Sequence, residues 1–103
     1  MSIKKQYLKS KNVCKVTFKI PKETAKDFKN ASVVGDFNHW NHKKHKMKKL
    51  KTDGSFSLLV EFEKGHEYQF RYLLDGKDWA NDTDADKHVT TYFGDSENSV
   101  LVI

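Results

Sequence analysis

Apolar and polar residues alternate with a period of two along most of the chain. The pattern is clearest over residues 14–20, where Cys14, Val16, Phe18 and Ile20 alternate with lysine and threonine. Such a period places one face of each segment against a core and the other in water, as in a half-buried β-strand. The pattern predicts seven short strands, at 14–20, 31–34, 47–51, 56–62, 68–74, 89–93 and 99–103.

Turn signals separate these strands. Asp53-Gly54 and Asp75-Gly76 are pairs that favour tight hairpins, because glycine and aspartate tolerate the positive φ that such turns need. No segment has the length and apolar period of an ordinary helix, although residues 22–30 are expected to form a loop with a short helical turn. We therefore expect an all-β fold, an immunoglobulin-like antiparallel β-sandwich of about seven strands. It spans residues 13–103 as one domain, after an N-terminal extension at 1–12.

Length and composition narrow the choice of function. A chain of 103 residues is too short for a TIM barrel, which needs about 250. Its basic start lacks the apolar stretch of a secretory signal, and no apolar run reaches the ~20 residues of a membrane span. Cys14 is the single cysteine, so an internal disulfide is excluded and we expect a buried thiol in a cytoplasmic protein.

The two tryptophans lie in polar stretches rather than in the alternating segments. Trp40 is flanked by His39 and Asn41, and Trp79 by Asp78 and Ala80. One interpretation is that each indole folds back as a cap on the sandwich. The other is an exposed aromatic platform, because a flat ring buries the apolar face of a sugar while nearby polar groups bond its hydroxyls.

Four segments together resemble the family 48 carbohydrate-binding modules. Residues 33–40 read VVGDFNHW, residues 65–76 read GHEYQFRYLLDG, Trp79 follows that turn, and residues 98–102 read NSVLV. The family includes the glycogen-binding domain of the AMP-activated protein kinase β subunit and the N-terminal early-set domain of isoamylases and glycogen branching enzymes. The resemblance covers residues 13–103 and implies the sandwich already expected.

The resemblance also implies a function and a set of site residues. It implies a non-catalytic, stand-alone module that binds α-glucan of the glycogen or starch type, with no cofactor, and with a separate glycogen-metabolising enzyme as a candidate partner. Trp40 and Trp79 take the place of stacking residues, Arg71 and Asn98 of hydrogen-bonding residues, with Glu97 as the alternative register for Asn98. Phe93 takes the place of an apolar residue beside the glucan.

Two other binding functions stay open, one of them with a partner class that the family resemblance implies. Trp40 and Trp79 would also suit a protein–protein interaction module that targets or regulates a glycogen-metabolising enzyme. The net charge is +5, and lysines crowd residues 43–51, as in some nucleic-acid binders. No exposed aromatic type interleaves those lysines, so nucleic acid is the weaker hypothesis.

The sequence offers little support for a metal site or for catalysis. Asp82, Asp84 and Asp86 alternate like the start of a calcium loop, but glycine and glutamate are missing from the later positions, so a solvated acidic loop is expected. His39, His42 and His45 are spaced by three in a loop whose lysines oppose a cation. There is no nucleophile elbow, phosphate loop or placed pair of acids, and we expect no enzymatic activity.

Overall fold

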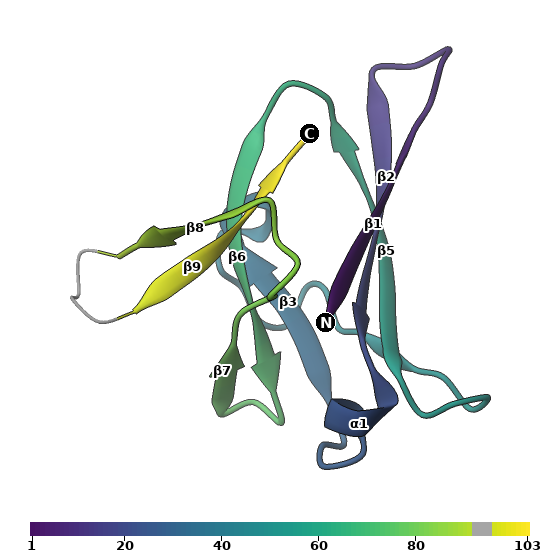
Figure 1. The fold of residues 1–103 in the computed structure, drawn as a ribbon, viewed down its shortest axis with the longest axis vertical. Coiled ribbons are helices and arrows are strands. Elements are labelled where there is room, and N and C mark those ends of the chain that lie inside the picture. The colour runs from purple at the N-terminus through teal and green to yellow at the C-terminus, as the bar shows by residue number, and fades with distance from the viewer. Residues whose placement is uncertain (92–95) are drawn as a thin grey trace.

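The computed structural model describes residues 1–91 and 96–103, which form two antiparallel β-sheets that pack as a sandwich (Figure 1). The strands are β1 (Ser2–Tyr7), β2 (Val13–Ile20), β3 (Ala31–Gly35), β4 (Lys48–Lys49), β5 (Phe56–Glu63), β6 (Glu67–Leu74), β7 (Asp78–Ala80), β8 (Lys87–Thr90) and β9 (Glu97–Val102). A short helix, α1 (Lys22–Ala25), and a 3₁₀ turn at Asp36–Asn38 complete the regular structure.

The strands form two sheets. One sheet, called sheet A here, has the order β1-β2-β5-β4, and the other, sheet B, has the order β3-β6-β9-β8 with β7 also paired to β6. Every pairing is antiparallel. The predicted all-β sandwich is confirmed. Helix α1 lies where the chain leaves sheet A for sheet B (Figure 1). No helix in the described part of the chain is long and apolar enough to cross a membrane.

Two strands, β1 and β7, were not expected from the sequence. The first twelve residues were expected to be an extension, but residues 2–7 pair with residues 14–19 of β2 as an edge strand of sheet A. Lys5 also reaches the other sheet, because its Nζ donates to the Asp86 carboxylate at 2.7 Å and to the Val102 carbonyl oxygen at 2.8 Å. The sequence did not show this strand, because Lys5 occupies a position that is inward in register, where the alternating pattern would have an apolar residue.

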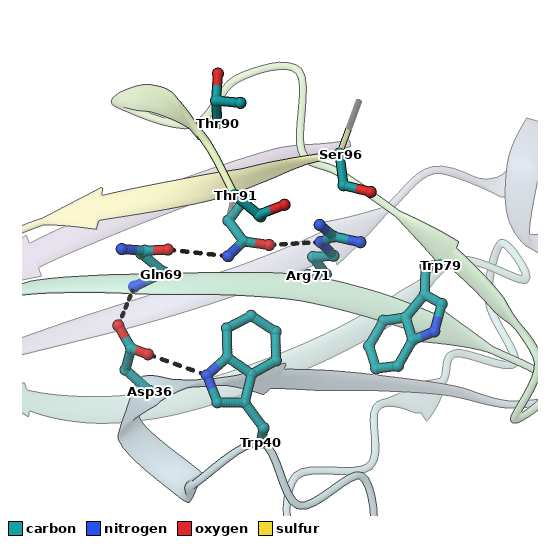
Figure 2. Close-up of a pocket in the computed structure, with 9 residues that line it drawn as sticks. Asp36, Trp40, Gln69, Arg71, Trp79, Thr90, Thr91 and Ser96 are labelled. Carbon is teal, nitrogen blue, oxygen red and sulfur yellow. Dashed lines mark hydrogen bonds between the residues drawn. The ribbon is translucent and has the colours of Figure 1, made fainter. Parts of the chain in front are cut away.

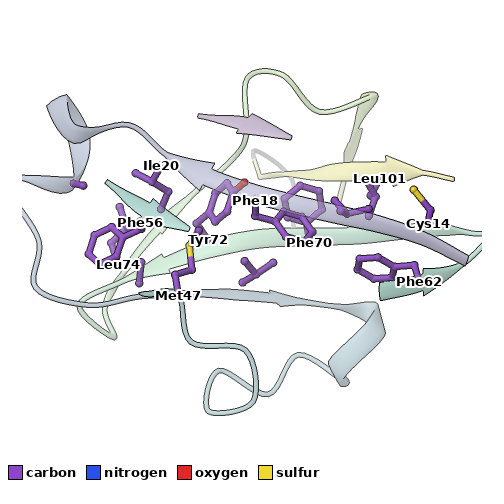
Figure 3. Close-up of a cluster of buried hydrophobic side chains, with 14 residues drawn as sticks. Cys14, Phe18, Ile20, Met47, Phe56, Phe62, Phe70, Tyr72, Leu74 and Leu101 are labelled. Carbon is purple, nitrogen blue, oxygen red and sulfur yellow. The ribbon is translucent and has the colours of Figure 1, made fainter. Parts of the chain in front are cut away.

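The core lies between the sheets, and the alternating apolar residues fill it (Figure 3). Phe18 of β2 is central, with its ring edge-on to Phe70 of β6 at 5.3 Å and to Tyr72 at 6.4 Å between centroids. Cys14 is fully buried and reduced, as predicted. Because the inner-facing residues of β6 pack here, the residues between them (Gln69, Arg71 and Leu73) face outward from sheet B.

The hairpin turn between β6 and β7 is bonded to a distant part of the chain. Asp75 and Gly76 adopt φ values of 52° and 70° between β6 and β7, as the Asp-Gly signal predicted. The Asp75 carboxylate accepts hydrogen bonds from the backbone N–H groups of Lys29 and Asn30, and these bonds lower the pKa of Asp75. The turn is therefore tied to the segment that enters β3.

Candidate functional site

The chain turns sharply where β3 ends, and this turn places Trp40. Gly35 lies so close to β6 that an added Cβ would stand 2.7 Å from the Phe70 Cβ atom, closer than real carbon atoms approach. His39 and Trp40 then both adopt left-handed backbone conformations, with φ of 56° and 58°. The Trp40 backbone N–H donates to the Gly35 carbonyl oxygen at 2.9 Å and closes the turn. The indole is thereby brought back beside the outer face of sheet B.

Asn38 holds this turn from the inside. It is almost fully buried, its Oδ1 accepts the Gly35 N–H at 3.0 Å, and its Nδ2 donates to the Val33 carbonyl oxygen at 2.9 Å. The same Nδ2 lies 3.0 Å from Nδ1 of His45, so that imidazole nitrogen must be an unprotonated acceptor. Burial, with Lys44 next in effect, lowers the pKa of His45 below 6.5 and agrees with a neutral ring.

Trp40 itself is fixed by the neighbouring acid. Its Nε1–H donates to Oδ1 of Asp36 at 3.0 Å, while Oδ2 of the same carboxylate accepts the Gln69 backbone N–H at 2.9 Å. Trp40 remains 37% exposed, so it is not packed as a buried cap.

A row of hydrogen-bonded polar side chains crosses the outer face of sheet B. Arg71 of β6 donates from Nε to Oδ1 of Asn98 on β9 at 2.5 Å. Asn98 donates in turn from Nδ2 to Oε1 of Gln69 at 2.9 Å. Asn98 is only 8% exposed and its amide is bonded at both ends, so the row is rigid.

Trp79 lies on the other side of Arg71. It was expected in a polar loop, but it occupies the centre of β7, opposite Leu73 of β6. Trp79 is 51% exposed, while Leu73 is buried. The short strand escaped prediction because three residues are too few to show a period, and pairing with β6 is what makes them extended.

These residues line one groove of about 480 Å³ (Figure 2). The structure brings together Trp40, Trp79, Arg71 and Asn98, the four predicted site residues that it describes; Phe93 lies outside the described residues. Asn98, not Glu97, is in the lining. Residues that the sequence did not single out also line the groove: Asp36, Gln69, Thr90, Thr91 and Ser96. Of these, Gln69 could have been predicted from the alternation of β6, because it lies on the same outer face as Arg71.

In the acidic stretch after β7, Asp84 and Asp86 are exposed as expected, but Asp82 is a buried structural anchor. Asp82 is fully buried, and its Oδ2 accepts the Tyr72 hydroxyl at 2.6 Å, while its backbone N–H donates to Oγ of Ser99 at 2.8 Å. Burial, followed by the charge and the hydrogen bond of Asp82, raises the pKa of Tyr72 well above its usual range. Asp86 binds Lys5 across the sandwich. Within residues 1–91 and 96–103, no three histidine, cysteine or acidic groups are placed to hold a metal ion.

Comparison with known proteins identifies the family. The model of carbohydrate-binding module 48, described as the isoamylase N-terminal domain, matches residues 8–90. That range contains Trp40, Arg71 and Trp79, whereas Asn98 lies beyond it. A search of curated proteins finds no match to the chain. The family match covers most of the chain and agrees with the observed sandwich, so the chain belongs to family 48 of the carbohydrate-binding modules, the family of the isoamylase N-terminal domain.

Proposed function

We propose that the chain binds α-glucan of the glycogen or starch type in the groove on sheet B. The observation that carries the proposal is the pairing of two exposed indoles, Trp40 and Trp79, on one groove with the Arg71–Asn98 hydrogen-bond row (Figure 2). The residues lie far apart in the chain, and three strands and a sharp turn are needed to assemble them. The α-linked class of glucan rests on the family to which the chain belongs and on the resemblance of its motifs.

The groove has the chemistry that a sugar polymer requires. A pyranose ring is apolar on its C–H faces and polar around its rim, so an aromatic platform beside fixed donors and acceptors recognises both. The hydroxyl-bearing residues Thr90, Thr91 and Ser96 add polar groups at one wall. Because the site is open and the ligand well hydrated, we expect a Kd of about micromolar to millimolar, or roughly −8 to −4 kcal/mol.

We infer that the groove binds without hydrolysing. Glycoside hydrolysis requires two carboxyl groups on opposite sides of the scissile bond. Asp36 is the one carboxylate in the described lining, and both its oxygens already accept hydrogen bonds, from Trp40 and Gln69. The expected result is no release of reducing sugar from glycogen by the purified protein.

The direct test is affinity electrophoresis and co-sedimentation with glycogen, amylose and a β-glucan. We expect retardation by the two α-glucans and none by the β-glucan. A Trp40→Ala/Trp79→Ala double variant should remain folded, judged by its melting temperature, and lose retention. Equal retention of the folded double variant would overturn the proposal. If no glucan retards the wild-type protein, the exposed tryptophans fit instead a protein–protein contact with a partner enzyme, since Trp is enriched at the centres of interfaces.

A further inference from the structure

The two groove tryptophans differ in how they are held. Trp40 is bonded at both ends, from its backbone N–H to Gly35 and from its indole Nε1–H to Asp36. Within residues 1–91 and 96–103, no hydrogen bond reaches the indole nitrogen of Trp79. Figure 2 shows the Trp40 nitrogen turned toward Asp36 and away from Trp79. One platform is therefore locked by a specific acid and the other is held by its strand.

Asp36 is placed to connect Trp40 to the strand that carries Arg71. Its Oδ1 accepts from the indole at 3.0 Å, and its Oδ2 accepts the Gln69 backbone N–H of β6 at 2.9 Å. Both carboxylate oxygens thus accept a hydrogen bond, and hydrogen bonds to a carboxylate are of the stronger kind. We propose that Asp36 is the positioning residue of the groove, which fixes the orientation of the Trp40 ring relative to Arg71.

This inference rests on the proposed function and sharpens it. An indole whose N–H is already donated to Asp36 cannot donate it to a sugar hydroxyl. Trp40 then contributes a ring face alone, and its contact with a glucan is stacking on C–H groups. Arg71 and Asn98 are left to bond the hydroxyls. Asp36 improves binding through Trp40, by holding the ring in the bound orientation before the ligand arrives.

A double-mutant cycle tests the coupling between the two side chains. Trp40→Phe keeps a ring face but removes the N–H that Asp36 binds. In the wild-type background, Asp36→Ala should weaken glycogen binding by about threefold to tenfold, the equivalent of one hydrogen bond. In the Trp40→Phe background, the same change should cost less than about twofold. Equal losses in both backgrounds would overturn the proposal, because Asp36 would then act on the glucan directly.

Matched variants separate positioning from charge and from folding. Asp78→Asn removes the same charge beside Trp79 and should leave binding within about twofold of wild type. Asp36→Asn keeps one acceptor but sets an amide NH₂ against one of the two donors, the Trp40 indole N–H or the Gln69 backbone N–H, so it should fall between wild type and Asp36→Ala. If Asp36→Ala unfolds, the asparagine variant decides: binding equal to that of Asp78→Asn would overturn the proposal.

A measurement without sugar distinguishes this inference from the proposed function. In a Trp79→Phe protein, Trp40 is the only tryptophan, and acrylamide quenching reports its freedom. Asp36→Ala should raise the quenching constant of folded protein by about twofold, while Asp78→Asn should not change it. Raised quenching in a protein that binds no glucan would leave the positioning role intact and reject the α-glucan function. Unchanged quenching would overturn the positioning role, whatever the protein binds.

Discussion

The outer faces of the two sheets differ although both come from strands with the same alternating pattern. On the outer face of sheet A, Lys15 of β2 lies opposite Glu61 of β5, and Thr17 lies opposite Leu59. On sheet B, the outward-facing Val34, Leu73 and Val100 are buried, yet none of them belongs to the core cluster between the sheets.

The difference shows that the side chains on the outer face of sheet B form a second ordered layer, outside the core between the sheets. Its apolar side chains are covered on the outer face, and its polar ones, Gln69, Arg71 and Asn98, are bonded to one another. Leu59 on sheet A is 57% exposed, more than either tryptophan, but stands alone among polar neighbours. A single exposed apolar residue is ordinary on a protein surface, whereas a preorganised apolar and polar set is typical of a binding site.

The largest expected effect is on stability and comes from the anchor beneath sheet B. Asp82→Ala should lower the free energy of unfolding by about 3 kcal/mol, because the buried Tyr72 hydroxyl loses its carboxylate acceptor and is left without a partner. Urea denaturation measures the change. Asp84→Ala is the matched control, since Asp84 enters this network through its backbone N–H and its side chain is exposed. Equal urea midpoints for the two variants would contradict the anchor.

The next effect is on glycogen binding and compares variants on the outer faces of the two sheets. Trp40→Ala and Trp79→Ala should each weaken glycogen binding at least tenfold, about 1.4 kcal/mol, with little change in melting temperature. Arg71→Ala should cost less, about threefold to tenfold, and Leu59→Ala on sheet A should change nothing. Tryptophans that were caps would instead lose about 3–5 kcal/mol of stability on truncation. Affinity gels and thermal melts on the same samples distinguish the two patterns.

A smaller effect joins the two sheets. Lys5→Met should reduce the free energy of unfolding by about 1 kcal/mol, because the partly exposed pair with Asp86 and the bond to Val102 are lost. Lys4→Met, on the exposed outer side of β1, is the control and should change stability by less than about 0.5 kcal/mol. Glycogen binding should be unchanged in both. A Lys5 variant as stable as the Lys4 variant would mean that β1 is not fastened to sheet B.

The smallest effect is a pH dependence at the turn that carries Trp40. The folded pKa of His45 lies below 6.5, so the unfolded chain binds more protons just below that pH. The stability contributed by neutral His45 is fully present above pH 6.5 and is lost as the pH falls through the folded pKa. In urea titrations between pH 7.5 and 5, His45→Gln should show a shallower decline than wild type, and His42→Gln should not. Identical declines in all three would remove His45 as the cause.

Most of the architecture could be predicted from the sequence, because most strands have a pattern of apolar and polar residues that can be recognised from neighbouring residues. The period of two in residues 14–20 and 56–62 and the Asp75-Gly76 turn need only neighbouring residues to be recognised. The strands β1 and β7 were missed for the opposite reason. Lys5 is inward in register yet carries its charge out to Asp86, and Trp79 is extended only because β6 pairs with it.

The candidate site shows the same division. Its indoles, Arg71 and Asn98 could be named from the motifs, but Asp36 and Gln69 could not, since an aspartate in a turn looks the same whether it faces water or an indole. Asp82 was misjudged as solvated for that reason, because local polarity does not reveal that Tyr72 lies behind it. The sequence by itself determined the alternating strands, the turns and the residue types of the groove. The tertiary structure alone decided which side chains meet, because hydrogen bonds such as Trp40 to Asp36 and Arg71 to Asn98 depend on distances set by the packing of strands far apart in the chain.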